Sequence, residues 1–168
     1  MEIKDSILVI DNFFDSNFLN QIKYDLSKCV FTNRYTEQDN SVYQKIYFNV
    51  NLSTEHFAVQ EVCKKLEKIN FKIKNINSNY FLSTKHKEAT PHKDESTSYN
   101  CLIYLQGENL INSGTGFYDL INNEYVLNCH IGFKENRAII FDSKIYHTSL
   151  QFDDRSGKRY VMANFIYE

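Results

Sequence analysis

Apolar and polar residues alternate through most of the chain after Asn70, which is the period-two pattern of β-strands. The alternating runs are short and are separated by stretches rich in Asn, Asp, Ser and Gly, the residues that favour turns. About eight short strands with polar turns between them predict a closed double sheet of the jelly-roll kind. The predicted strands cover 71–76, 80–82, 99–106, 115–120, 124–131, 137–141, 145–151 and 159–167.

Two segments before Asn70 have apolar residues at helical spacing instead. The first runs from 18 to about 29 and the second from 58 to 69. Each follows small polar residues that can accept a hydrogen bond from the first turn of a helix. The candidate caps are Asp15 or Ser16 for the first helix and Ser53 or Thr54 for the second.

The remaining N-terminal segments are short, and their patterns predict two strands and a loop. Ile7 to Ile10 is an apolar, β-branched run that predicts a buried strand, whereas 32–41 is polar and predicts a loop, followed by a strand at 42–50. The predicted fold is therefore mainly β with flanking helices (α+β), a double-stranded β-helix of the jelly-roll or cupin-like kind packed against two N-terminal helices. We expect one domain over 1–168, with a helical N-terminal part at 1–70 and the jelly-roll core at 71–168.

Composition narrows the possible partners. Of the 168 residues 42% are apolar, which suffices for one sizeable core. With 19 basic and 21 acidic side chains the net charge is −2, which disfavours nucleic acid and anionic membranes as general partners. No apolar run approaches the roughly 20 residues that span a bilayer, and we expect a soluble protein of the cytoplasm. The four cysteines lack a Cys-x-x-Cys pair, so reduced and mostly buried thiols are expected.

His92 and Asp94 are candidate metal ligands. In an extended segment alternate side chains share a face, so these two can point into one space while Lys93 points away. His147, on a later β-like segment, can supply a third ligand. Two histidines and one carboxylate leave other metal positions open, which is the arrangement of non-haem Fe(II) oxygenases. Pro91, the sole proline, would fix the backbone that enters this site.

Other histidines are weaker candidates. His86 and Glu88 repeat the His-x-acid spacing, but they lie in a charged stretch that predicts an exposed loop. His130 lies in an alternating strand and is expected on the solvent face. A single His-x-acid triplet occurs readily by chance, so the metal hypothesis depends on the set of His92, Asp94 and His147.

Arg159 begins the last predicted strand and is a candidate carboxylate ligand. Its guanidinium is permanently charged and forked, so it can hold a planar carboxylate through two parallel hydrogen bonds. A buried arginine in a barrel needs such a partner. Arg155 lies in the turn Asp-Asp-Arg-Ser-Gly and is expected to be exposed.

Taken in order, several motifs resemble the Fe(II)- and 2-oxoglutarate-dependent dioxygenases, and within them the prolyl-4-hydroxylase-like branch. The resemblance extends over nearly the whole chain, from Ile7 to Tyr167. It is carried by the order and spacing of 9–14, 91–94, 101–106, 113–117, 137–142, 146–149 and 159–160.

This resemblance implies a ligand set. His92, Asp94 and His147 would hold Fe(II). 2-Oxoglutarate would chelate this metal, and O2 would take the last open position. Arg159 would bind the far carboxylate of 2-oxoglutarate, with the Tyr104 hydroxyl as a second donor. Tyr80 aligns with an aromatic position that lines the pocket in this branch, although a place in the core is an equal alternative.

The implied reaction is hydroxylation of a C–H bond with release of succinate and CO2. Without a basic face, an amino-acid residue, a peptide or a free amino acid is a better candidate substrate than a nucleobase. Residues 83–91 and 106–114 are expected to form the rim. Two other classes stay open: a cupin-like metal enzyme that does not use 2-oxoglutarate, and a catalytically silent jelly-roll that binds a ligand or partner.

Overall fold

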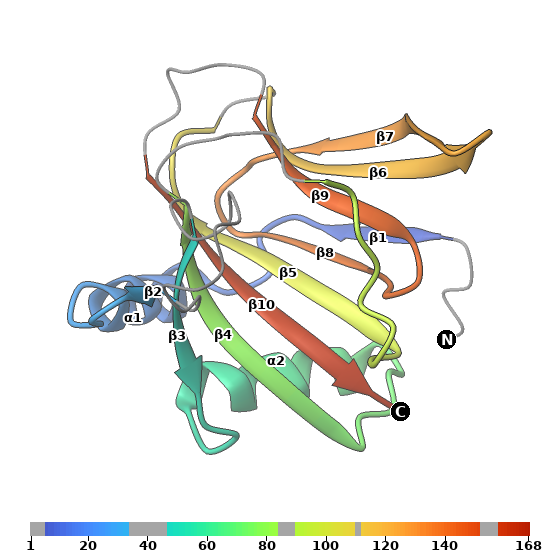
Figure 1. Ribbon diagram of the computed structural model, residues 1–168. Coiled ribbons are helices and arrows are strands. Elements are labelled where there is room, and N and C mark those ends of the chain that lie inside the picture. The colour runs from blue at the N-terminus through green and yellow to red at the C-terminus, as the bar shows by residue number, and fades with distance from the viewer. Residues whose placement is uncertain (1–5, 34–46, 84–89, 110–111, 152–157) are drawn as a thin grey trace.

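The computed structural model describes residues 6–33, 47–83, 90–109, 112–151 and 158–168 (Figure 1). These residues form two helices and ten strands. The helices are α1 (Ser16–Leu26) and α2 (Phe57–Lys68). The strands are β1 (Ile7–Ile10), β2 (Thr32–Asn33), β3 (Tyr47–Leu52), β4 (Asn75–Ser83), β5 (Tyr99–Gln106), β6 (Ser113–Ile121), β7 (Glu124–Gly132), β8 (Arg137–Asp142), β9 (Tyr146–Gln151) and β10 (Arg159–Tyr167).

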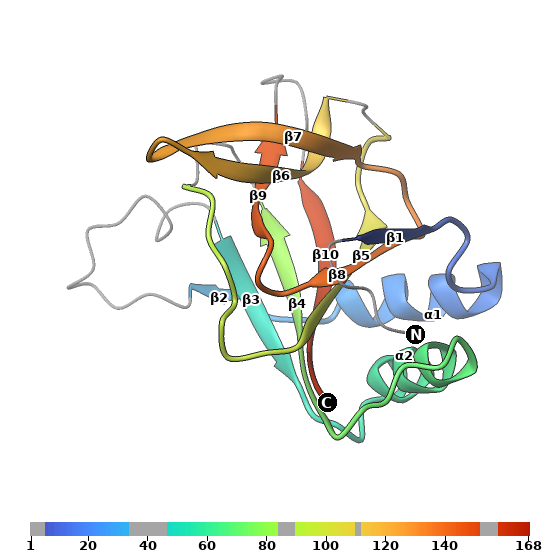
Figure 2. The same cartoon turned by 90° about the vertical axis from the view of Figure 1, so that its right-hand side faces the viewer.

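The strands form two antiparallel sheets. The larger has seven strands in the order β1-β8-β5-β10-β4-β3-β2, and the smaller has three in the order β7-β6-β9. Figures 1 and 2 show the small sheet on one side of the large sheet and both helices on the other. The prediction of a mainly β chain with two flanking helices is confirmed.

Alternation along the central strands divides the interior between the two faces of the large sheet. On β5, Cys101, Ile103 and Leu105 belong to the apolar cluster that the helices cover. Tyr104 belongs to a second cluster on the opposite face, together with Phe117 of the small sheet. Because both faces are covered, β5 is buried along nearly its whole length.

The strands from β5 onward agree with the sequence prediction to within two residues. The turn between β6 and β7 shows why these boundaries are readable. Asn122 and Asn123 have φ angles of 51° and 65°, and a type I′ hairpin turn requires positive φ at both central residues. Asparagine tolerates this conformation better than most residues.

Several predictions for the first half of the chain are wrong in detail. The first helix is capped by Asp15 as predicted, with its carboxylate accepting from the Phe18 amide at 2.9 Å. The second is capped by His56 rather than by Ser53 or Thr54, since 53–56 forms a turn and the His56 ring accepts from the Ala58 amide at 3.3 Å.

Three further predictions also change. The predicted strands 71–76 and 80–82 form one strand, β4, which begins only at Asn75. Asn70, at the end of α2, has a positive φ of 67°. Thr32 and Asn33 pair with β3 rather than forming a loop, and 34–46 lie outside the described residues. β1 is half-exposed because it is the edge of the large sheet, with Val9 38% exposed.

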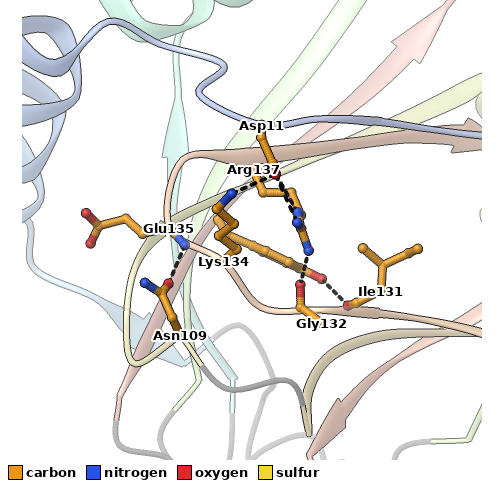
Figure 3. Close-up of polar contacts among 8 residues, drawn as sticks. Asp11, Asn109, Ile131, Gly132, Lys134, Glu135 and Arg137 are labelled. Carbon is orange, nitrogen blue, oxygen red and sulfur yellow. Dashed lines mark hydrogen bonds and ion pairs between the residues drawn. The ribbon is translucent and has the colours of Figure 1, made fainter.

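β1 and β2, both from the N-terminal part, form the two outer edges of the large sheet. Asp11, just after β1, fastens one of these edges to the β7–β8 connection (Figure 3). Its carboxylate accepts from Arg137 Nε and from Lys134 Nζ, each at 2.7 Å. Within the described ranges, no helix is long and apolar enough to cross a membrane.

Candidate metal and co-substrate site

The three predicted metal ligands converge. The ligand atoms of His92, Asp94 and His147 all lie within 4.8 Å of one another. His92 and His147 pair their backbones in an isolated antiparallel bridge, with N–H···O distances of 3.0 and 2.9 Å. Their ring centroids are 4.6 Å apart. In the part of the chain that the structure describes, no other group of three potential metal ligands is this compact.

Asp94 is placed by a turn rather than by a strand. Its amide donates to the carbonyl of Ser143, in the β8–β9 turn, at 2.9 Å. Its own carbonyl accepts from the Thr97 amide at 3.1 Å. His92 and Asp94 therefore point into one space as expected, and backbone hydrogen bonds with Ser143 and Thr97 hold Asp94 beside the histidines.

The proton positions at this site fit a bound cation. His147 Nδ1 lies 2.9 Å from the Ile145 carbonyl, which can only accept, so Nδ1 carries the proton of the neutral ring. His147 Nε2 then presents a lone pair, and Asp94 Oδ2 lies 3.3 Å away from it. Two acceptors at this distance repel unless a proton or a cation lies between them. A divalent metal satisfies both, and His and carboxylate ligands suit Fe(II) or Mn(II).

Electrostatics favour the protonation states that a metal needs. His92 lies at the solvent edge of the site, yet the atoms packed around it lower its pKa and the neighbouring His147 lowers it further. Burial by itself raises the pKa of Asp94, but the proximity of His147 and the hydrogen bond from Asn100 together outweigh burial, and the net shift is downward. A neutral His92 and an ionised Asp94 are therefore the expected states at neutral pH.

A cavity of about 370 Å³ lies between the two sheets and includes the three candidate ligands in its wall. Its size falls within the usual range for small-molecule sites. Arg159 and Tyr104 also line it. Apolar side chains of the large sheet form much of the remaining wall, namely Phe81, Leu102, Val161, Ala163 and Phe165.

Arg159 is only 4% exposed and is held by the small sheet. One terminal nitrogen donates to the Ser113 hydroxyl at 2.5 Å and to the Leu150 carbonyl at 3.2 Å, and the other donates to the Ser149 hydroxyl at 2.6 Å. These contacts fix the guanidinium in the cavity wall. Sequence reasoning missed both serines, although Ser149 follows His147 by two positions and so shares its face of β9.

Tyr104 is 2% exposed, and its hydroxyl lies 2.8 Å from that of Thr115. Its ring stacks on Phe133 with centroids 4.6 Å apart. Burial raises the pKa of Tyr104 to about 12, so the group is a neutral hydroxyl at physiological pH. The Tyr104 hydroxyl donates to the Ile131 carbonyl through a long contact of 3.4 Å. With Thr115 as a donor to it, the Tyr104 hydroxyl can direct its own proton to a ligand in the cavity instead.

Tyr80 faces away from the cavity. It is completely buried in the cluster that the helices cover, and its ring meets His56 edge-on with centroids 5.8 Å apart. Its strand neighbours Phe81 and Ser83 line the cavity instead. Of the two alternatives for Tyr80, the structure therefore places it in the core, because alternate residues of β4 face opposite sides of the sheet.

His130 is half-buried opposite Gly116 and is not part of the triad. This partial burial contradicts the expectation of a side chain on the solvent face. Burial lowers the pKa of His130, and the charge of Arg159 lowers it further. His86, Glu88 and Arg155 lie outside the described residues, as does part of each predicted rim segment.

Asn100 is a site residue that the sequence reasoning missed. Its amide nitrogen donates to Asp94 Oδ2 at 2.6 Å, and it is 1% exposed in the cavity wall. Its spacing from Leu102 and Tyr104 on β5 could have revealed it, since all three occupy alternate positions on the cavity face.

Comparison of the sequence with family models gives no match, and no curated protein matches it significantly. Solved structures do match. A prolyl hydroxylase from Trichoplax adhaerens in complex with a hypoxia-inducible factor peptide has a TM-score of 0.65 at 15% identity, covering 96% of this chain and 83% of that one. A prolyl-4-hydroxylase from Pseudomonas putida has a TM-score of 0.66 at 10% identity, with coverages of 96% and 92%. HygX from Streptomyces hygroscopicus, with nickel and 2-oxoglutarate bound, has a TM-score of 0.67 at 11% identity, with coverages of 96% and 82%.

At these identities the comparison establishes the fold. The chain has the fold of the Fe(II)- and 2-oxoglutarate-dependent oxygenases, and its similar structures include prolyl hydroxylases. The resemblance that the sequence motifs indicated is confirmed at this level.

Proposed function

We propose that this protein is an Fe(II)- and 2-oxoglutarate-dependent dioxygenase that hydroxylates a C–H bond of an amino-acid residue, a peptide or a free amino acid. Succinate and CO2 would be the co-products. The observation that carries this proposal is that His92, Asp94 and His147 converge in the wall of the same cavity that contains the buried Arg159. The two sheets around that cavity would be the two halves of a double-stranded β-helix.

Each residue has a role that follows from its surroundings. His147 Nε2, one carboxylate oxygen of Asp94 and one ring nitrogen of His92 would hold Fe(II), with the Nδ1 proton of His147 directed to Ile145. The iron, when bound, supplies the activation of O2 and the oxidation of the substrate. Arg159 would bind the far carboxylate of 2-oxoglutarate, to which the Tyr104 hydroxyl would also donate.

The position of Arg159 favours this function over a cupin-like enzyme that does not use 2-oxoglutarate, and the complete set of three metal ligands favours it over a catalytically silent jelly-roll. Ser113 and Ser149 hold its guanidinium against the cavity. A fixed guanidinium suits a ligand that carries a carboxylate, and a cupin-like enzyme without 2-oxoglutarate does not require one. The structures with similar folds point the same way, since HygX holds nickel and 2-oxoglutarate and the Trichoplax enzyme holds a peptide.

The test is succinate formation from 2-oxoglutarate by the iron-loaded protein, measured against a panel of amino acids and peptides with oligonucleotides as a contrast. Metal binding is measured in parallel without oxygen. His92→Ala and His147→Ala should abolish both metal binding and turnover, whereas His130→Ala, a matched half-buried histidine outside the triad, should retain metal. Metal retention by all three variants would contradict the ligand assignment. Metal binding without 2-oxoglutarate consumption would favour the cupin-like alternative.

A further inference from the structure

Asn100 makes a close contact with the candidate metal site that the roles above do not explain. Its side-chain amide donates to Asp94 Oδ2 at 2.6 Å. Asn100 is 1% exposed and lies on β5 in the middle of the large sheet, paired with Phe141 on one side and Phe165 on the other. The donor therefore sits on a rigid element, at a position where the backbone cannot easily move.

Asp94 needs such a restraint more than His147 does. His92 and His147 are fixed by their backbone bridge, and the His147 ring is oriented by the Ile145 carbonyl. Asp94 lies in a turn, and its side chain is 24% exposed. A carboxylate in this setting can rotate about its side-chain bonds unless another group holds one of its oxygens.

The orientation of the Asn100 amide follows from its two neighbours. The ionised Asp94 carboxylate only accepts, so the nitrogen of the amide must face it. The amide oxygen faces the Thr97 hydroxyl at 3.5 Å, and that hydroxyl in turn lies 3.1 Å from the Asp94 carbonyl. The Thr97 hydroxyl has one proton and can donate to only one of these two oxygens, so the 2.6 Å bond from the Asn100 amide to Oδ2 is the contact that restrains the Asp94 carboxylate.

We propose that Asn100 is a positioning residue for the metal: it holds the Asp94 carboxylate in the orientation that lets it share a cation with His92 and His147. This inference rests on the proposed metal site. Partners behind a metal ligand orient it, and their loss typically lowers metal affinity by about 10- to 100-fold. We expect a change of that size when the Asn100 amide is removed.

The experiment compares two buried asparagines. Asn164 is completely buried on β10, accepts from the Ser78 hydroxyl at 2.7 Å and donates to the Cys101 carbonyl at 2.9 Å. It is therefore matched to Asn100 in burial and hydrogen bonding but has no contact with the triad among these bonds. Asn100→Ala, the shape-conserving Asn100→Leu and Asn164→Ala are each titrated with Ni²⁺ without oxygen, and urea unfolding of the metal-free proteins records stability.

We expect both Asn100 variants to bind Ni²⁺ about 10- to 100-fold more weakly than the parent, and Asn164→Ala to bind it within about threefold while losing stability.

A double-mutant cycle of Asn100 and Asp94 separates an effect of Asn100 on the Asp94 carboxylate from a general weakening of metal binding. If Asn100 acts through Asp94, Asn100→Ala should weaken Ni²⁺ binding little further when Asp94 is already glycine, since the two histidines are then the remaining ligands.

The possible failures are distinguishable. Parent-like Ni²⁺ affinity in both Asn100 variants would overturn the role of Asn100 and leave the metal site intact. Equal weakening by Asn100→Ala and Asn164→Ala, or an undiminished effect of Asn100→Ala beside Asp94→Gly, would show a general loss of stability and also overturn it. A parent protein that binds no Ni²⁺ would remove both this inference and the proposed function.

Discussion

At the scale of single residues, Arg159 is a buried charged side chain whose guanidinium is fixed in the cavity wall. Long cationic side chains normally keep their charge in water, yet Arg159 is 4% exposed. Hydroxyl and carbonyl oxygens from β6 and β9 accept hydrogen bonds from its two terminal nitrogens and fix the guanidinium in the cavity wall. A carboxylate ligand in the cavity would therefore meet a preorganised cation, and removal of that cation would leave the carboxylate buried without its partner.

Replacement of Arg159 by alanine should cost about 3 to 5 kcal/mol of 2-oxoglutarate binding, roughly a hundredfold to several thousandfold in affinity. Lysine should recover only part of the loss, because it keeps the charge but lacks the two-pronged geometry. Titration of 2-oxoglutarate into the anaerobic metal-loaded variants measures this. Lys158→Ala, at the exposed neighbouring position, is the control and should bind like the parent. An Arg159→Ala protein within about threefold of the parent would rule out the co-substrate role.

At the scale of elements, side-chain hydrogen bonds hold the short edge strand β1 against its neighbours. β1 has only four residues, and the chain after it is fastened to the β7–β8 connection at two places. The Asn136 side chain accepts from the Phe14 amide and donates to the Phe14 carbonyl at 2.9 and 2.8 Å. Asp11 accepts from Arg137 and Lys134 nearby. These contacts compensate for the small pairing area of an edge strand.

The Asp11 contacts predict a pH dependence of stability. Hydrogen bonds from Arg137 and then Lys134 hold the pKa of Asp11 far below its ordinary range. The lowered pKa means that the stabilisation is fully present above about pH 4, where the unfolded carboxyl titrates, and is lost as the pH falls below that. Because the carboxylate is 35% exposed, we expect at most about 1 kcal/mol. Urea unfolding should show Asp11→Asn less stable than the parent at pH 6, with the difference shrinking as the pH falls below 4; a constant difference would contradict this.

Two glycines of β6 predict contrasting effects on the small sheet. A Cβ at Gly114 would lie 2.0 Å from the Ile131 carbonyl oxygen, which is backbone of the paired strand. A Cβ at Gly116 would meet side-chain atoms of Leu150 at 2.4 Å, and a side chain can rotate. Gly114→Ala should therefore destabilise by about 3 kcal/mol or more and Gly116→Ala by about 1 to 2. Thermal unfolding of the two variants compares them, and equal losses would be inconsistent with this account.

At the scale of the whole molecule, the candidate metal site joins distant parts of the chain. The Asp94 amide donates to the Ser143 carbonyl in the β8–β9 turn, and the backbone of His92 pairs with that of His147 on the small sheet. A cation bound to all three residues would link these segments only in the folded protein. Binding should therefore raise the free energy of unfolding.

With Mn²⁺ at one hundred times its dissociation constant, the free energy of unfolding should rise by about 2.7 kcal/mol. Differential scanning fluorimetry with and without Mn²⁺ measures the accompanying rise in melting temperature. His147→Ala should lose this rise and His130→Ala should keep it. A similar rise in both variants would indicate metal binding elsewhere on the chain.

The local sequence pattern by itself determined the strands of the second half of the chain and most of the candidate site residues. The strands from Tyr99 onward followed from period-two alternation and from turn residues such as Asn122 and Asn123, because strand pairing and hairpin turns impose those preferences directly on the sequence. The predicted site residues His92, Asp94, His147 and Arg159 likewise followed from residue type, spacing and family resemblance. The structure brings all four to one cavity.

Only the tertiary structure decided the features that depend on contacts between distant segments. The sequence could not show that Tyr80 faces the helices, that His56 caps α2, or that Asn100 reaches Asp94. Alternation says that neighbouring residues of β4 face opposite sides, but not which side holds the helices when both are apolar. A hydrogen bond between a turn and a central strand depends on how the chain folds back, and that is set by the packing of the two sheets and helices rather than by any local pattern.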